Sequence, residues 1–374
     1  MYSASQIFPA GQKPPRRSLY KASLLADADS GRILLQDRIH NQIFPASLVK
    51  MMVALITLEE IESGRISLQD SVIISEWASK IGGHQVYLKQ GEIFSLYELM
   101  KATVIGSAND AAVAVAEHVM GNDKVFIKKM NERARELGMK NTRFNSVHGL
   151  PPGRNQKMDV SSAYDFYLLS LELLKHPQFL NWSSTRLESF RNGTFQLLNT
   201  NHRLIKSYNG MEGMKTGYHR KAGFNLVSTA IRKGKRFISI VLGAKSSRIR
   251  SKSTKYLLDY GFNNFLKYDL NKKEQSLPFS LKVEDGVMEN VSLQISETTS
   301  IILSPDERKK LKIQPIIPSS TDAPVKEKQK IGRIEYWLNG KLLKVVALQT
   351  EHAVPKQNIF SGITGMFTNL ADTN

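Results

Sequence analysis

The sequence is organised around one segment, Ile43-Phe44-Pro45-Ala46-Ser47-Leu48-Val49-Lys50-Met51-Met52-Val53-Ala54-Leu55-Ile56-Thr57-Leu58. Proline suits the first turn of a helix, apolar residues then recur on more than one face, and Gly64 follows as a stop, so the segment predicts a mostly buried helix. Ser47 lies in its first turn, where backbone N–H groups lack intrahelical partners. Such groups, at the positive end of the helix dipole, suit a developing oxyanion.

Lys50 follows Ser47 by three residues, so on a helix its amine can reach the Ser47 hydroxyl. An amine that is desolvated among apolar side chains, or placed near a second cation, loses part of its preference for the proton and can act as a base. Ser47 is therefore a candidate nucleophile and Lys50 its base. A chain of this length holds about two Ser-x-x-Lys matches by chance. The other one, at 18–21, lies in a strand-like run where residues three apart point to opposite faces.

Composition limits the classes of function. The chain has 374 residues, 41% of them hydrophobic, a formal net charge of +18, and no cysteine, which excludes disulfides, thiolate zinc sites and a cysteine nucleophile. The basic charge suits an anionic partner such as nucleic acid, a membrane surface or a cell-wall polymer. No apolar run is long enough to span a bilayer, and residues 1–5 do not resemble an export signal. We expect either a cytosolic protein or a mature form whose export signal has been removed.

The order of elements predicts a mixed domain followed by a smaller all-β domain. Residues 1–17 are expected to form an N-terminal arm, 18–266 the larger domain, 267–354 the all-β domain, and 355–374 an amphipathic helix that either docks on its own domain or lies on a membrane surface. Strands are expected at 18–25, 32–38, 224–231 and 236–243, and helices at 95–105, 111–120, 123–137, 162–174 and 251–264. Asn339-Gly340 predicts a hairpin turn in the all-β domain.

Two further short motifs follow the Ser47 helix. Ser107-Ala108-Asn109 lies at a break between two expected helices. Side chains at such a break can project into a cleft. Lys215-Thr216-Gly217 enters a sheet-forming hairpin, which predicts an edge strand whose free backbone groups can pair with an extended ligand, and the glycine permits a close approach. Each motif alone is weak evidence for a function, since a second Ser-x-Asn occurs at 207–209.

Together, the order and context of the three motifs resemble the penicillin-recognising serine acyl-enzyme families, and most closely the D-alanyl-D-alanine carboxypeptidases among the low-molecular-mass penicillin-binding proteins. The resemblance runs from about residue 18 to the end of the chain and includes the runs 146–150, 162–165, 199–201, 213–218 and 222–226. It implies an α/β (α+β) fold, with a β-lactamase/transpeptidase-like domain whose antiparallel sheet is flanked by helices, a small all-β C-terminal domain and a terminal amphipathic helix.

The resemblance also implies a reaction. Ser47 would attack the carbonyl between the two terminal D-alanines of a peptidoglycan stem peptide, and water would later hydrolyse the acyl-enzyme. Lys50 would deprotonate Ser47. Ser107 and Lys215 would relay the proton to the leaving amine, and Asn109 would hold the substrate amide. β-Lactams would acylate the same serine, and no cofactor or metal is required.

The substrate contacts implied by the resemblance come from the third motif and a distant arginine. The backbone N–H groups of Ser47 and Tyr218 would form the oxyanion hole, although some relatives have histidine at the position of Tyr218. Thr216, beside Gly217, would meet the terminal carboxylate together with a guanidinium. The best-placed candidate is Arg250, and Arg248 is the alternative. His148 either lines the rim of the cleft or is structural.

Three other functions remain as alternatives. A class A β-lactamase would place a deacylating glutamate in a Glu-x-x-Leu-Asn run between the second and third motifs, whereas the one such run here, Glu335–Asn339, comes later. A D,D-endopeptidase has related chemistry, but such relatives tend to lack the all-β domain. A non-catalytic basic wall-binding protein also fits the charge, while nothing matches a nucleic-acid module. The resemblance implies an extracytoplasmic location, on the periplasmic side or outer face of the membrane.

Overall fold

The computed structural model describes residues 17–153 and 157–357, so the expected N-terminal arm and terminal amphipathic helix lie almost entirely outside the described residues. The chain divides into two compact units between Asn264 and Phe265. No helix in the described ranges is long and apolar enough to cross a membrane.

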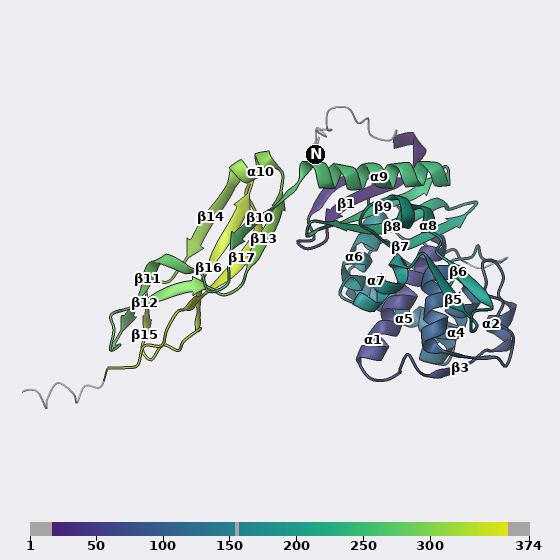
Figure 1. The fold of residues 1–374 in the computed structure, drawn as a ribbon, viewed down its shortest axis with the longest axis horizontal. Helices are drawn as coiled ribbons and strands as arrows, with labels where there is room; N and C mark the ends of the chain where they lie inside the picture. Colours follow the sequence, from purple (N-terminus) through teal and green to yellow (C-terminus); the bar gives the residue numbers. More distant parts are fainter. Residues whose placement is uncertain (1–16, 154–156, 358–374) are drawn as a thin grey trace, which may run out of the picture. The chain divides into compact units, whose positions relative to one another are not determined.

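The first unit is built on a five-stranded antiparallel sheet in the order β2-β1-β9-β8-β7. Its strands are β1 (Ala22–Asp27), β2 (Ile33–Asp37), β7 (Met211–His219), β8 (Gly223–Arg232) and β9 (Lys235–Ala244). Helix α9 (Ser247–Asn264) covers one face of the sheet, and α6 (Ala163–Leu173) packs against the other (Figure 1). The antiparallel sheet flanked by helices confirms the expected fold class.

The remaining elements of this unit form a helical layer with two small two-stranded sheets. The helices are η1 (Arg17–Leu19), η2 (Ala46–Val49), α1 (Lys50–Glu62), α2 (Glu76–Lys80), α3 (Leu96–Lys101), η3 (Ala102–Gly106), α4 (Asn109–Met120), α5 (Asp123–Glu136), α7 (Pro177–Ser184) and α8 (His202–Ser207). These sheets pair β3 (Ser71–Ile73) with β4 (Ile93–Ser95), and β5 (Leu187–Phe190) with β6 (Phe195–Leu198).

The expected central helix is present and begins with a tighter turn. Ser47 lies in the 3₁₀ turn η2, and α1 starts only at Lys50. Every residue from Lys50 to Leu58 is buried, which confirms a helix with apolar residues on all sides. Such burial of large apolar side chains contributes about 1.5–3 kcal/mol each. Gly64 has φ +73°, the left-handed conformation of a helix stop.

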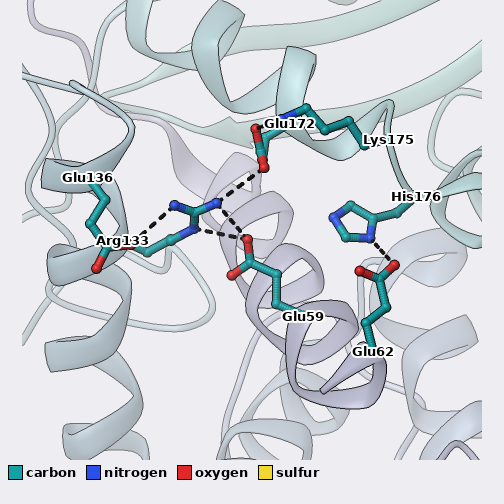
Figure 2. Close-up of polar contacts among 7 residues, drawn as sticks. All are labelled: Glu59, Glu62, Arg133, Glu136, Glu172, Lys175 and His176. Carbon is teal, nitrogen blue, oxygen red and sulfur yellow. Dashed lines mark hydrogen bonds and ion pairs between the residues drawn. The ribbon is translucent and has the colours of Figure 1, made fainter. Parts of the chain in front are cut away.

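A polar network fixes the far end of α1 (Figure 2). The guanidinium of Arg133 on α5 lies 2.7 Å from a carboxylate oxygen of Glu59 on α1 and 3.2 Å from one of Glu172 on α6. The ring Nδ1 of His176 lies 2.7 Å from a carboxylate oxygen of Glu62. Because one planar cation joins three helices, this network sets the position of the helix whose other end holds Ser47 and Lys50.

The sequence-predicted boundaries differ at two functional places. Ser95 forms the expected capping box, but α3 ends at Lys101 and a wider π turn, η3, continues to Gly106. Helix α9 begins at Ser247 and not at Ser251, so Arg248 and Arg250 both lie in its first turn. Ser246 caps that start, because its hydroxyl accepts from the Ile249 N–H at 3.2 Å, and this signal was missed in the sequence.

The second unit consists almost entirely of strands, as expected. A six-stranded sheet has the order β14-β16-β17-β12-β11-β15, and β10 (Leu266–Asn271) pairs with β13 (Thr299–Leu303). The six strands are β11 (Ser276–Glu284), β12 (Asn290–Ile295), β14 (Leu311–Ile316), β15 (Ser320–Asp322), β16 (Lys330–Leu338) and β17 (Lys341–Thr350), and α10 (Pro305–Lys310) adds one short helix. Asn339 and Gly340 both have positive φ and form the predicted hairpin turn between β16 and β17.

Candidate active site

Ser47 and Lys50 lie side by side at the start of the buried helix. The Lys50 amine is 3.2 Å from the Ser47 hydroxyl, 2.7 Å from Asn109 Oδ1 and 2.8 Å from the carbonyl oxygen of His148. Lys50 is only 1% exposed. Two of the three predicted motifs therefore meet at one amine.

The environment of Lys50 favours the uncharged amine. Burial lowers the pKa of Lys50 well below its usual value, and the nearby charge of Lys215 lowers it further, against the opposite influence of Asp110 and Asp159. An uncharged amine has two N–H bonds and one lone pair. If the Asn109 and His148 oxygens take the two N–H bonds, the lone pair faces the Ser47 hydroxyl. This arrangement suits a base.

A second serine–lysine pair lies beside the first. The amine of Lys215, on β7, donates to the Ser107 hydroxyl at 2.6 Å. Burial, with a smaller contribution from the charge of Arg250, lowers the pKa of Lys215 to about 7. This amine can therefore hold or release a proton near neutral pH.

The break at Ser107 has a visible structural cause. The π turn η3 ends at Gly106, Ser107 follows with a left-handed φ of +61°, and α4 starts two residues after Ser107. The buried Asp110 carboxylate accepts backbone N–H bonds from Val86 and Leu88 at 3.1 Å each, which fixes the neighbouring loop. Asn109 Nδ2 donates to the Gly82 carbonyl in the same loop, at 2.8 Å. Asn109 and Asp110, which follow Ser107, are thus held in place by the loop 82–88.

The 146–150 run is held in the site by another buried carboxylate. Asp159 accepts hydrogen bonds from the backbone N–H and hydroxyl of Ser146, at 2.9 and 2.6 Å, and the Ser146 hydroxyl accepts from the Gly149 N–H. A Cβ at Gly149 would lie 2.1 Å from the Ala46 carbonyl oxygen, so glycine is required there. This loop presents the His148 carbonyl to Lys50.

The His148 side chain has a separate role from its carbonyl. Its ring Nδ1 accepts from the Leu150 N–H at 3.1 Å. Burial lowers the pKa of His148 to about 4, so the ring is neutral and its proton lies on Nε2. The structure favours a positioning role through the carbonyl over a charged role for the ring.

The third motif lies on an edge strand, as expected. β7 is the last strand of the five-stranded sheet and carries Lys215, Thr216, Gly217 and Tyr218. A Cβ at Gly217 would be 2.4 Å from the Pro45 carbonyl oxygen and 3.2 Å from the Ser47 nitrogen. The strand therefore passes directly against the Ser47 turn, and only glycine permits that approach.

Two side chains of this strand face different surroundings. The Thr216 hydroxyl donates to the Thr200 hydroxyl at 2.7 Å. The ring of Tyr218 is 56% exposed and stacks on Phe224, with centroids 4.2 Å apart. Since the ring points into solvent, any oxyanion contact of Tyr218 belongs to its backbone N–H.

Arg250 is the better placed of the two candidate guanidinium groups. Its charge lowers the pKa of Lys215, which places it beside the second serine–lysine pair. Within the described ranges, Arg250 Nε is buried without a hydrogen-bond partner. Burial lowers its own pKa to about 10, so it remains cationic at neutral pH. Arg248 is exposed. A guanidinium whose Nε is buried without a partner suits an anionic ligand group.

Asn225 contributes to the site, although its role was not evident from the sequence. It lies on β8, is fully buried, and donates through Nδ2 to the carbonyls of Phe44 and Pro45 at 3.0 and 3.1 Å. Its Oδ1 accepts from the Gly243 N–H at 2.7 Å. Asn225 therefore ties the sheet to the segment that precedes Ser47. It belongs to the 222–226 run, and only its presence in that run could have drawn attention to it.

The other matches to the short motifs, which occur by chance, lie outside the cluster of active-site residues. The second Ser-x-x-Lys begins in η1 and not in the expected strand, since β1 starts only at Ala22. The second Ser-x-Asn lies at the end of α8, and the Glu-x-x-Leu-Asn run lies in the second unit. Among the described residues, no three His, Asp or Glu side chains gather as a metal ion would require.

An antiparallel sheet flanked by helices, with two serine–lysine pairs beside an edge strand, defines the penicillin-recognising class of serine acyl-transfer enzymes. A family model described as D-alanyl-D-alanine carboxypeptidase matches residues 12–246, and one described as penicillin-binding protein 5, C-terminal domain, matches residues 265–356. The chain belongs to the D-alanyl-D-alanine carboxypeptidase family, the serine-type carboxypeptidases among the penicillin-binding proteins, as the sequence motifs predicted.

Individual relatives support this assignment over most of the chain. The D-alanyl-D-alanine carboxypeptidase DacF of Bacillus subtilis (strain 168) is 34% identical over 331 residues, which cover 86% of this chain and 82% of that protein. Penicillin binding protein 5 from Haemophilus influenzae has a similar crystal structure, with a TM-score of 0.76 and 29% identity, over 92% of this chain and 100% of that one. Penicillin-Binding Protein D2 from Listeria monocytogenes, in its ampicillin-bound form, gives a TM-score of 0.59 and 32% identity over 65% of this chain and 97% of that one.

Proposed function

We propose that this carboxypeptidase removes the terminal D-alanine from peptidoglycan stem peptides through an acyl-enzyme on Ser47. The observation that carries the proposal is the buried Lys50 amine, which lies 3.2 Å from the Ser47 hydroxyl and whose pKa is lowered well below its usual value. Family membership supports the substrate class.

In the proposed acylation, the Ser47 oxygen attacks the carbonyl between the two D-alanines while its proton passes to the Lys50 lone pair. Negative charge develops on the carbonyl oxygen, which the backbone N–H groups of Ser47 and Tyr218 stabilise. The close passage of Gly217 supports this oxyanion site, because it brings β7 against the Ser47 turn.

The C–N bond then breaks and the leaving amine needs a proton. Ser107 and Lys215 relay to it the proton that Lys50 has taken from Ser47, since their 2.6 Å hydrogen bond and the Lys215 pKa of about 7 suit a proton relay. Asn109 contributes its amide to the substrate backbone. Water later hydrolyses the ester and returns the Ser47 hydroxyl.

The terminal carboxylate of the substrate is proposed to bind Thr216 and Arg250. The Thr216 hydroxyl can turn from Thr200 to the ligand, and the buried Arg250 Nε gains a partner. This contact would favour a carboxypeptidase, because the bond that it cuts lies one residue before a free C-terminal carboxylate. We propose His148 as a positioning residue that acts through its carbonyl.

Intact-mass analysis after incubation with benzylpenicillin tests the proposal. The expected result is a stable adduct on the wild type and none on Ser47→Ala, followed by D-alanine release from a pentapeptide by the wild type alone. No adduct with intact drug would refute Ser47 as the nucleophile. No adduct with consumed drug would favour the β-lactamase alternative, and cleavage of cross-linked peptides without D-alanine release would favour the endopeptidase.

Two further proposals concern location. We propose an extracytoplasmic site of action, where peptidoglycan lies, and a peripheral membrane contact through residues 355–374, most of which lie outside the described residues. Flotation with liposomes, comparing the full chain with one that ends at Pro355, tests the contact. Equal flotation of the two would refute it.

A further inference from the structure

The second unit has a pocket at the edge of its six-stranded sheet. Its volume is about 630 Å³, and its lining residues are Lys310, Lys312, Gln314, Trp337, Asn339 and Gly340. Strand β14 is the edge strand, and Lys312 pairs directly with Trp337 on β16. Because opposed residues in a ladder share a face, these two side chains lie on the face opposite the core residues Tyr336 and Leu338.

The Trp337 side chain is held before any ligand arrives. Its ring Nε1 donates to a Glu335 carboxylate oxygen at 3.0 Å, and the other oxygen accepts from Arg333 Nε at 2.7 Å. Glu335 is only 9% exposed. The edge of the indole is therefore fixed, while the side chain still lines the pocket. A preorganised aromatic ring loses little entropy when a ligand stacks on it.

The pocket is also cationic and rich in amides. Lys310 and Lys312 are both exposed and reach the pocket, and the Glu335 charge is already paired with Arg333. Gln314 and Asn339 offer amide donors and acceptors. One aromatic platform, two amides and two lysines match a ligand with an apolar ring face, acetamido or hydroxyl groups, and carboxylates.

We propose that this pocket binds an N-acetylated polysaccharide, namely the glycan strands of peptidoglycan, which carry a free lactyl carboxylate at each muramic acid that bears no stem peptide. A pyranose ring stacks its C–H face on Trp337, the amides contact acetamido and hydroxyl groups, and the lysines contact carboxylates. The choice of this polymer rests on the proposed function of the first unit, whereas the chemistry of the pocket is independent of it.

This inference gives a role to the run Glu335–Asn339, which resembled a β-lactamase motif by chance. Within it, Glu335 orients Trp337, and Asn339 both forms the hairpin turn and lines the pocket. Binding the glycan through the second unit would keep the first unit at a high local concentration of stem peptides, without any change in its own contacts.

The test measures binding of the full chain to glycan strands from which an amidase has removed the stem peptides, so that the Ser47 site has no substrate. Fluorescence anisotropy of end-labelled strands gives the Kd at low and high salt. Trp337→Ala is expected to raise the Kd at least about tenfold. Lys312→Gln is expected to raise it about threefold to tenfold at low salt and less at high salt.

Ile313→Ala is the matched control. Ile313 lies between Lys312 and Gln314 on the same strand, is 53% exposed, and does not line the pocket. Its Kd should stay within about twofold of the wild type. Lys312→Gln changes an exposed residue, so its effect cannot be attributed to unfolding if Trp337→Ala proves unstable.

The outcomes separate this proposal from the proposed function. Absent binding, a Trp337→Ala Kd within twofold of the wild type, or equal displacement by polyglutamate of the same charge would overturn the glycan site, the last because it would show charge attraction alone. D-Alanine release from a short soluble pentapeptide should be unchanged in Trp337→Ala. Failure of the wild type to release D-alanine would refute the Ser47 chemistry and leave the glycan result standing.

Discussion

Replacing Gly217 by alanine should slow acylation of Ser47 by about 100-fold while leaving the fold intact. The added Cβ would lie 2.4 Å from the Pro45 carbonyl oxygen and 3.2 Å from the nitrogens of Ser47 and Leu48. Real Cβ contacts stay above 3.0 Å, so β7 or the Ser47 turn must move by at least about 0.6 Å. That movement separates the two backbone N–H groups proposed to stabilise the oxyanion.

The expected 100-fold loss of rate is based on the cost of similar displacements in other enzymes. Misplacing a reacting group by about 1 Å costs on the order of 100-fold, and loss of one oxyanion donor costs about 100-fold to 1000-fold in kcat. A 100-fold loss corresponds to about 2.7 kcal/mol in the acylation barrier. The assay is the second-order rate of benzylpenicillin acylation, followed by intact mass, with D-alanine release as the second readout.

Gly82→Ala is the matched control for this substitution. Gly82 lies beside the site, where its carbonyl accepts from Asn109, but a Cβ there meets nothing within 4 Å. Its acylation rate should stay within about twofold of the wild type. If Gly217→Ala also acylates within about threefold of the wild type, the close approach of β7 does not matter for the reaction and the proposed oxyanion site is wrong.

Three other substitutions test the surroundings of the site. Asn225→Ala should lower the free energy of unfolding by about 3–5 kcal/mol, measured by urea titration, because three buried hydrogen bonds are lost; a change below 1 kcal/mol would contradict this reasoning. Arg250→Gln should raise the KM for a pentapeptide by about tenfold or more, and Arg248→Gln, an exposed neighbour, should leave it unchanged; equal effects would remove Arg250 from the carboxylate site. Lys215→Met should abolish D-alanine release yet stabilise the fold by about 2–4 kcal/mol at pH 6. The pKa of Lys215 falls from 10.5 to about 7 on folding, so the charged form costs most below pH 7 and the gain should fade as the pH rises to 10; a gain that grows with pH would refute this.

The sequence predicted the parts of the site that depend on local spacing. Ser47 and Lys50 are three residues apart on one helical turn, so their contact follows from helical geometry alone. The hairpin of β8 and β9 follows from alternating residues around a short turn, and the edge position of Lys215 follows from its place before that hairpin. The meeting of the three motifs was inferred only through the family resemblance, since more than 50 residues separate each motif from the next.

Other features depend on contacts between distant segments, for which spacing gives no signal. Asn225 bonds to carbonyls about 180 residues away, and Asp159 and Asp110 hold loops through backbone N–H groups that any residue could supply. The π turn before Ser107 was missed because the capping box at Ser95 predicts where a helix starts and not how it ends. Such buried polar groups become recognisable only when their partners are in place.

The charges of the site suggest how one cluster binds an anion and still offers a base. Burial lowers the pKa of Lys50, Lys215 and Arg250, the charge of Arg250 lowers that of Lys215 further, and the charge of Lys215 lowers that of Lys50 further. Only Arg250 has an ordinary pKa so high that its side chain stays fully charged at neutral pH after burial has lowered that pKa. The arginine thus keeps the positive charge that a substrate carboxylate requires, while its proximity helps Lys215 to release a proton, and Lys215 in turn lowers the proton affinity of Lys50. Replacing the arginine with a neutral residue would therefore affect both binding and proton transfer, whereas a lysine at the same position would share the protonation problem of the other two.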